Sequence, residues 1–373
     1  MRIGLIAPLV TPIREPQQGG SQSVVADLAA GLTNRGHDVH LYAASGSAIS
    51  GVTVIDTGVD PSALRELMYR ADRPPPPDLA VADAAFAAVY DAVAQVGYDV
   101  VHNHAFDPPA VRLAASLLSP VVHTLHLPPD SAMAMALDVA RQSENRPIVA
   151  TVSTSQAIAW QALTPVDTVL PNGVPIDRIP WSAEADERVI FAGRLSPEKG
   201  AADAVTIARE AGVSIHLYGD PYDIEYAQAL RESYRDDLGV YFHAGIARTQ
   251  LWQIMARTRV VLCPAKWDEP FGMVAAEAQA TGTPVIAYRR GALPEVIIDG
   301  RTGFVVRPDD VQAAAVALTR VGSIQRAECR RHAETNLSLD ASLAAHERLY
   351  ERLTAPLPLR APTRPSPAAG EAT

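Results

Sequence analysis

Two glutamates eight positions apart are the first residues in this sequence whose types and spacing could do chemistry. Glu269 and Glu277 both lie in WDEPFGMVAAEAQATGTPV, residues 267–285. Pro270 and Gly272 oppose helix formation around Glu269, so Glu269 is expected on a loop. The helical pattern begins just after them and places Glu277 within the first two turns of a helix.

The start of this predicted helix suits an anion. The backbone N–H groups of Gly272, Met273 and Val274 have no partner within the helix, and the helix dipole adds positive potential there. A carboxylate on each side would repel a phosphate, but it would accept hydrogen bonds from neutral hydroxyl groups. The pattern favours a ligand whose sugar and ribose flank a diphosphate. Two unrelated glutamates, one of them beside a helix dipole, would give the same spacing.

Arg194 and Lys199 form a second candidate site in FAGRLSPEKG, residues 191–200. Two cations between a strand and a helix could neutralise a departing diphosphate, whereas the alternative is a solvated loop with ordinary charges. Lys199 is one of only two lysines among 32 basic residues, which favours a functional role. There is no P-loop or GxSxG motif, and no DxD motif stands where a metal–diphosphate site would need it. No metal or other cofactor is therefore expected.

Gly19 and Gly20 precede the first helical pattern in PQQGGSQSVVADL. Small residues and free N–H groups at a helix start would let the chain approach an anion. The segment lacks the GxGxxG dinucleotide motif, and a plain flexible loop would look the same.

Four histidines occur near the ends of two predicted strands. His102 and His104 lie in VHNHAFD, and His123 and His126 lie in VVHTLHLPP. Alternate strand residues share a face, so His102 and His104 could converge. No HExxH or carboxylate spacing supports a metal site. His126, at a strand end, is expected to line a cleft, whereas the roles of His102 and His104 stay open.

The composition is that of a soluble globular protein with two or three domains. The 373 residues are 48% hydrophobic and 20% charged, and no apolar run approaches the roughly 20 residues of a membrane span. No signal-peptide region follows the N-terminus, and Cys263 and Cys329 form no disulfide framework, so a cytoplasmic protein is predicted. The net charge of −10 argues against nucleic acid or an anionic membrane as partner.

Strand-like and helix-like segments alternate along the chain, which predicts parallel sheets flanked by helices. A first series of strands is expected at RIGLIAP, HDVHLYA, DVVHNH, PVVHTLH and IVATVS. A second is expected at RVIFAG, SIHLYG, VYFHAG, RVVLCP, TPVIAY and GFVV. The Pro- and Gly-rich segment 170–187 is the candidate joint, and RPPPP at 73–77 is predicted to be a loop. The prediction is an α/β protein with two Rossmann-like, doubly wound domains facing a central cleft.

In this order, the motifs resemble the GT-B fold retaining glycosyltransferases of family 4. The resemblance rests on GG before the first helix, the VxTxH-type strand end, VxS near 152, PNGV, GRLSPEKG, the E-x7-E pair, GTPVIA, GALPEVI and DGRTGFVV. It implies an acceptor-binding domain over 1–175, a nucleotide-sugar-binding domain over 176–337, and a terminal helix over 338–354 that crosses back to the first domain. The Pro/Ala/Thr-rich tail, 355–373, is expected to be disordered.

The resemblance also implies a role for each candidate residue. The implied catalytic residues are His126, Arg194, Lys199 and Glu269. His126 and Glu269 would touch the donor sugar, whereas Arg194 and Lys199 would stabilise the departing diphosphate. The implied donor- and nucleotide-binding residues are Gly19, Gly20, Gly193, Gly272, Met273, Val274 and Glu277, the last of them on the ribose. Glu295 in LPEVI is expected to be structural.

The predicted activity is metal-independent transfer, with retention, of a sugar from a nucleoside diphosphate sugar, by default UDP-glucose, to a hydroxyl of a small soluble acceptor. The family is thought to react on one face of the sugar, with the leaving phosphate helping to deprotonate the incoming hydroxyl. Residues 1–175 carry 9 Arg and 16 acidic residues, which argues against an anionic lipid acceptor. A non-catalytic sugar-nucleotide-binding protein and a Rossmann-type oxidoreductase are the alternatives, the latter disfavoured because GxGxxG is absent. The nucleotide base, the linkage and the oligomeric state stay open.

Overall fold

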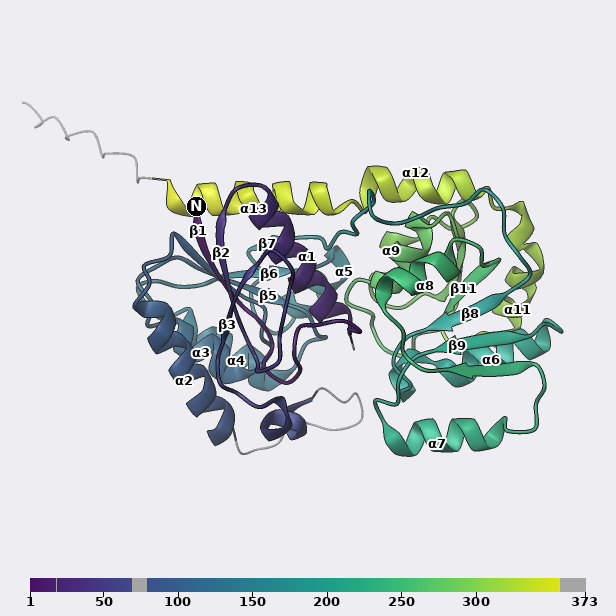
Figure 1. Cartoon of the computed structure of the whole chain (residues 1–373), viewed down its shortest axis with the longest axis horizontal. Coiled ribbons are helices and arrows are strands. Elements are labelled where there is room, and N and C mark those ends of the chain that lie inside the picture. The colour runs from purple at the N-terminus through teal and green to yellow at the C-terminus, as the bar shows by residue number, and fades with distance from the viewer. Residues whose placement is uncertain (18, 69–78, 356–373) are drawn as a thin grey trace, which may run out of the picture.

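The computed structural model describes residues 1–17, 19–68 and 79–355. These residues form two parallel β-sheets, each flanked by helices and lying side by side (Figure 1). The predicted loop at 73–77 and the predicted tail at 355–373, except its first residue, lie outside the described residues.

The first sheet has seven parallel strands in the order β3-β2-β1-β4-β5-β6-β7. The strands are β1 (Arg2–Ile6), β2 (Asp38–Ala43), β3 (Thr53–Asp56), β4 (Val100–Asn103), β5 (Val121–Leu125), β6 (Ile148–Thr151) and β7 (Thr168–Val169). Its helices are α1 (Gly20–Asn34), the 3₁₀ helix η1 (Pro61–Leu67), α2 (Ala80–Ala94), α3 (Pro108–Ala114), α4 (Ser131–Ala140) and α5 (Thr154–Gln161). The strand order reverses between β1 and β4, and ligands of such sheets bind beyond the carboxyl ends at this point.

The second sheet has six parallel strands in the order β10-β9-β8-β11-β12-β13. The strands are β8 (Val189–Ala192), β9 (Ile215–Tyr218), β10 (Val240–His243), β11 (Val260–Cys263), β12 (Val285–Tyr288) and β13 (Gly303–Val306). Its helices are η2 (Pro197–Lys199), α6 (Ala201–Glu210), α7 (Ile224–Ser233), α8 (Arg248–Met255), α9 (Met273–Ala280), α10 (Leu293–Val296), α11 (Val311–Arg320), η3 (Val321–Ser323) and α12 (Arg326–Asn336). Here the order reverses between β8 and β11.

Every predicted strand is present, and so is the predicted helix that begins at Met273. Two further strands, β3 and β7, were not predicted. Their residues Thr53–Asp56 and Thr168–Val169 are half-buried or exposed, and both strands are at the edges of the first sheet. An edge strand buries little side-chain surface, so it carries no strong apolar pattern.

The last helix, α13 (Leu339–Thr354), follows the second sheet in sequence but packs against α1 of the first (Figure 1). The chain passes from one sheet to the other at Val174 and again at residues 337–339, and these two connections pair with each other. The N–H of Val174 donates to Leu337 O at 2.8 Å, and the N–H of Leu339 donates to Val174 O at 2.9 Å. Leu343 and Tyr350 of α13 then enter the core of the first sheet. The chain therefore ties its two halves together twice.

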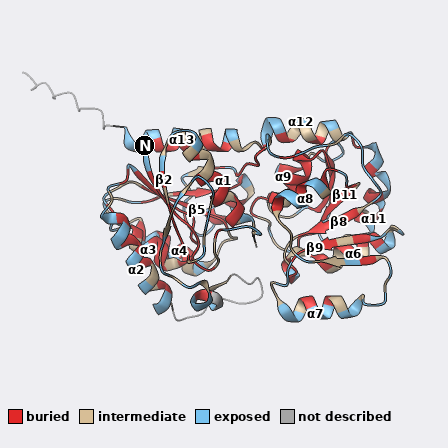
Figure 2. Cartoon of the chain, in the orientation of Figure 1, coloured by how far each residue is buried: buried red, intermediate tan, exposed pale blue. Residues whose placement is uncertain are grey.

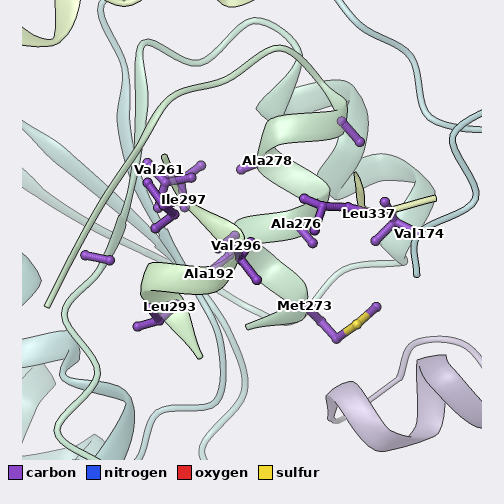
Figure 3. Close-up of a cluster of buried hydrophobic side chains, with 14 of the residues drawn as sticks. Val174, Ala192, Val261, Met273, Ala276, Ala278, Leu293, Val296, Ile297 and Leu337 are labelled. Atoms are coloured by element: carbon purple, nitrogen blue, oxygen red, sulfur yellow. The ribbon is translucent and has the colours of Figure 1, made fainter. Parts of the chain in front are cut away.

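Buried residues make up much of both sheets and of the inner faces of their helices (Figure 2), and most of the buried residues are apolar. Helix α9 is unusual because alanines let it pack closely on several sides, with residues 275–280 all buried. It lies against α12, and Leu293 and Val296 of α10 belong to the same apolar cluster (Figure 3). Close packing fixes the direction of α9, and therefore the position of its N-terminus.

Candidate active site

A cleft of about 920 Å³ is formed where the carboxyl ends of the two sheets meet. Its walls are the loops that follow β1, β5, β8, β9 and β11, together with the start of α9. All of the predicted site residues line this cleft: Gly19, Gly20, His126, Gly193, Arg194, Lys199, Glu269, Gly272, Met273, Val274 and Glu277. The structure therefore brings them to one place from segments far apart in the sequence.

Lys199 and Glu269 form an ion pair at the wall of the cleft. Lys199 Nζ lies 2.8 Å from Glu269 Oε2, and Trp267 Nε1 donates to the same oxygen at 2.7 Å. The ammonium group is also 4.5 Å from the centre of the Trp267 ring, a cation–π distance. Both side chains keep some access to the cleft, at 23% and 15% exposure. A ligand that carries an anionic group and a hydroxyl group could bind both side chains. Its anion would take the place of Glu269 beside Lys199, and its hydroxyl would take the place of Lys199 beside Glu269.

Arg194 follows β8 and is held by two neighbours. One of its Nη atoms lies 3.1 Å from Glu198 Oε1, and its guanidinium lies 4.0 Å from the centre of the Tyr222 ring. Ser196 Oγ donates to the same Glu198 oxygen at 2.7 Å. These contacts fix the planar guanidinium, and the loop from Arg194 to Lys199 carries two cations that both line the cleft.

The start of α9 faces the cleft between Glu269 and Glu277. Its first turn follows Gly272, whose φ of 97° favours glycine and where a Cβ would lie 2.9 Å from Leu293 Cδ2. Among the described residues, no side chain caps this helix. The first N–H groups of α9 therefore remain available to an anion, as the sequence predicted.

Glu277 is engaged in a buried ion pair that the sequence did not reveal. Arg248 Nε donates to Glu277 Oε1 at 2.5 Å, and Arg248 Nη1 donates to Asp27 Oδ2 at 2.6 Å. Burial raises the pKa of Glu277, and the Arg248 charge opposes that rise. Asp27 belongs to α1 of the first sheet, whereas Arg248 begins α8 of the second. Arg248 therefore joins the two halves of the molecule beside Glu277, the residue that is expected to bind the ribose.

One signal for this contact was present in the sequence. Asp27 lies between Val25, Leu28 and Ala29 on the apolar face of α1, and all of these residues are buried. A carboxylate on a buried helix face requires a cationic or hydrogen-bonding partner. The sequence cannot say which residue supplies it, because the partner is 221 positions away.

Five buried histidines lie beneath the cleft and are called here the histidine cluster: His102, His104, His123, His126 and His346. The rings of His102 and His104 are stacked with centroids 4.0 Å apart, which confirms that these two residues converge. Of the cluster, His126 lines the cleft. Burial lowers the pKa of His126 to about 4, with a smaller contribution from His346. Within the described ranges, no group of three or more His, Cys, Asp or Glu side chains is arranged to hold a metal ion.

Two family models match adjoining segments of this chain. The Glycosyltransferase Family 4 model matches residues 18–178, and the Glycosyl transferases group 1 model matches residues 176–336. The chain belongs to the group 1, family 4 glycosyltransferases. The two matches meet within the Pro- and Gly-rich segment 170–187. This assignment decides against the oxidoreductase alternative.

Two of the curated relatives of this glycosyltransferase come from Mycobacterium tuberculosis. Glycogen synthase is 29% identical over 163 residues, which cover 41% of this chain and only 39% of that protein. The chain therefore spans less than half the length of this relative. Phosphatidyl-myo-inositol mannosyltransferase is 29% identical over 347 residues, covering 85% of this chain and 86% of that protein.

Solved structures share the GT-B fold of this glycosyltransferase. Sucrose-phosphate synthase from Thermosynechococcus elongatus has a TM-score of 0.77 at 20% identity and covers 95% of this chain and 99% of its own. Anabaena HepE in complex with UDP and glucose has a TM-score of 0.72 at 20% identity, covering 94% of this chain and 99% of its own. The fold is two Rossmann-like domains that face a cleft.

The starts of α1 and α9 touch across the cleft of the glycosyltransferase. A Cβ on Gly20 would lie 3.3 Å from Met273 Cγ, and Figure 3 shows the Met273 side chain extending from α9 toward the N-terminal segment. The N–H of Gly19 donates to Gln22 Oε1 at 3.2 Å. The free N–H groups predicted at this glycine pair therefore do not include that of Gly19.

Glu295 provides another contact between the two domains. Its carboxylate accepts from the N–H of Thr154 at 3.0 Å and from the N–H of Ser155 at 2.6 Å, and it also accepts from Ser155 Oγ. These groups begin α5, so a residue of α10 caps a helix of the other domain. The structural role expected for Glu295 is confirmed, and its form is an interdomain helix cap.

Proposed function

We propose that this glycosyltransferase moves a sugar, with retention of configuration, from a nucleoside diphosphate sugar to a hydroxyl group of a small soluble acceptor. UDP-glucose is the default donor. The observation that carries the proposal is the meeting of Lys199, Glu269 and the uncapped start of α9 in one cleft. A cation, a hydroxyl acceptor and a row of N–H donors are what a sugar diphosphate needs.

The donor would exchange partners with the Lys199–Glu269 ion pair of the cleft. Its diphosphate would take Lys199, Arg194 and the N–H groups of α9, whereas Glu269 would turn to the hydroxyl groups of the sugar. Glu277 would accept from the ribose. Two cations and a helix terminus can balance the charge of the departing diphosphate, and we propose that no metal ion is needed.

The transfer step breaks the bond between the anomeric carbon and the diphosphate oxygen and forms a bond from that carbon to the acceptor oxygen. We propose that both events occur on one face of the sugar, and that the proton of the acceptor hydroxyl passes to the departing phosphate. The cationic loop with Arg194 and Lys199 would then stabilise the developing negative charge during bond cleavage.

The choice of donor and acceptor has separate support. A solved structure of Anabaena HepE contains UDP-glucose, which favours a uridine donor here. The described residues of the first domain that line the cleft present uncharged polar side chains, among them Thr11, Gln17, Ser21, Ser23 and Asn172. Such a wall suits a neutral, hydroxyl-bearing acceptor. Among the described residues, no helix has the length and apolarity to cross a bilayer. The cytoplasmic location stays a prediction.

Calorimetric titration with UDP, GDP, ADP and dTDP tests the nucleotide, and UDP should bind best. Incubation with UDP-glucose alone should then release glucose slowly, and NMR of the fresh product should show the α anomer if configuration is retained. Lys199→Ala should abolish this release, whereas Lys266→Ala is the matched control because Lys266 pairs with Asp203 away from the cleft. Binding without any release would favour the non-catalytic sugar-nucleotide-binding protein, and a β product would contradict retention.

A further inference from the structure

His104 contacts the cleft residue His126 from the neighbouring strand. His104 follows β4 and His126 follows β5, and these strands are adjacent and parallel. His104 Nδ1 lies 2.9 Å from His126 Nε2, and the two rings are stacked with centroids 5.2 Å apart. This contact occupies one ring nitrogen of His126. The other, Nδ1, has no partner among the described residues and is not enclosed by protein, so it is the nitrogen that the cleft can reach.

The two imidazoles must share one proton across their contact. Burial lowers the pKa of both rings, so each is neutral at ordinary pH and carries a single proton. If His104 Nδ1–H donates, the proton of His126 must be on Nδ1. If instead His126 Nε2–H donates, the proton of His104 must be on Nε2, and His126 Nδ1 faces the cleft as a bare acceptor.

The surroundings of His104 Nε2 decide between these arrangements. This atom is buried, and it has no hydrogen-bond partner among the residues that the structure describes. A proton there would make an unpaired buried N–H, which is rarer and more costly than an unused lone pair. The first arrangement is therefore favoured, with His104 as the donor and the His126 proton on Nδ1.

The neighbouring rings hold His104 in this orientation. His102 stacks on it, and His102 is itself fixed by Tyr350 Oη at 2.6 Å and Thr124 Oγ1 at 2.7 Å. The titratable groups near His104 are other histidines of the cluster. Burial lowers their pKa values as well, so they too are neutral. Tyr350 belongs to α13, so the terminal helix supports the ring stack beneath the cleft.

We propose that His104 is a positioning residue that sets the tautomer of His126, so that His126 presents Nδ1–H to the cleft as a hydrogen-bond donor. This assignment rests on the proposed function in one respect only, namely that the acceptor of the hydrogen bond is an oxygen of the sugar nucleotide. As a neutral donor with this fixed proton, His126 orients an oxygen of the ligand and does not act as a general base.

The tautomer can be measured without any activity. In the full-length protein labelled with ¹⁵N-histidine, the ring nitrogen shifts distinguish a protonated Nδ1 from a protonated Nε2, and His126→Asn identifies the His126 signals. The expected wild-type spectrum has His126 protonated on Nδ1. In His104→Asp, whose carboxylate can only accept, the His126 proton should move to Nε2 at pH 8. In His104→Asn, whose amide N–H₂ can take the place of Nδ1–H, the wild-type tautomer should be kept.

The kinetic readout should follow the same order. We expect His104→Asp to lower kcat about 10-fold, the loss of roughly one oriented hydrogen bond, and His104→Asn to keep most of the wild-type value. His216→Asp is the control, because it makes the same change in a similar stacked pair with His243, at 3.0 Å, outside the cleft.

The spectrum decides the outcome. A wild-type His126 protonated on Nε2 would overturn the proposal, and so would an unchanged tautomer in His104→Asp. If His104→Asp fails to fold, the wild-type and His104→Asn spectra still decide. The expected tautomers in a protein that transfers no sugar would leave this inference standing and reject the proposed function.

Discussion

Arg248 is the residue whose replacement best tests how the two domains are held together. Its side chain is 9% exposed, and each of its two carboxylate partners, Asp27 and Glu277, is 6% exposed. Arg248→Met keeps much of the aliphatic length and removes the charge, which leaves Glu277 buried without its cation and Asp27 with only the half-exposed Arg178, 3.6 Å away. Removing one partner of a buried ion pair costs about 3–5 kcal/mol, so we expect the free energy of unfolding to fall by about that amount at pH 8.

The loss of unfolding free energy in Arg248→Met should become smaller as the pH falls. Burial raises the pKa of Glu277 and Arg248 opposes the rise, so in the variant this pKa increases further. An acid whose folded pKa lies above its unfolded value takes up its proton first in the folded state. The variant should therefore recover stability relative to wild type below pH 8, by up to about 1.4 kcal/mol per pH unit while one such carboxylate titrates.

Urea unfolding of both proteins at pH 8 and pH 6 measures these quantities. Since two domains can unfold separately, circular dichroism and tryptophan fluorescence should be followed together. Arg178→Met is the matched control. Arg178 lies 3.6 Å from Asp27 but is 55% exposed, so this substitution should lower the free energy of unfolding by less than about 1 kcal/mol. Equal effects of the two substitutions, or a loss in Arg248→Met that does not depend on pH, would refute the reasoning.

Four further outcomes are expected. Glu269→Gln should abolish transfer in an activity assay with little change in melting temperature, because Glu269 lies at the open wall of the cleft. Gly20→Val should weaken nucleotide binding about 10-fold by calorimetry, since its Cβ would already lie 3.3 Å from Met273 and the added methyls would push the two helix starts apart. Glu295→Ala should cost about 1 kcal/mol as the loss of a helix cap, seen as faster hydrogen exchange at the start of α5. The histidine cluster should make the protein acid-sensitive: its folded pKa values are lowered, that of His126 to about 4, so urea midpoints should fall as the pH drops from about 6.5 toward 4.

The sequence predicted the two sheets and the loops that form the cleft for one physical reason. A strand buried on both faces is a short continuous apolar run, and the runs RVVLCP and TPVIAY appear as β11 and β12. In a parallel sheet the carboxyl ends meet at one edge, so the loops after such runs are expected to converge. Arg194 after β8 and Glu269 after β11 do so.

The partners of these residues could not be predicted in the same way. Lys199 and Glu269 are 70 positions apart and Arg248 and Asp27 are 221 apart, so only the folded chain makes them neighbours. His104 gave no sign of a separate role from His102, because alternation places both on one face. What separates them is the hydrogen bond that each ring makes, to His126 in one case and to Tyr350 and Thr124 in the other.

The Lys199–Glu269 ion pair predicts that a complete sugar nucleotide binds better than its parts, given the donor contacts proposed above. A nucleoside diphosphate alone would draw Lys199 away from Glu269 and leave that carboxylate without its cation in a partly enclosed site. A free sugar would engage Glu269 but would offer Lys199 no anion in exchange. Only a ligand that carries both groups satisfies both partners at once, because the phosphate replaces the carboxylate and the hydroxyls replace the ammonium. Under the proposed donor contacts, selectivity for the whole donor then follows from the Lys199–Glu269 ion pair.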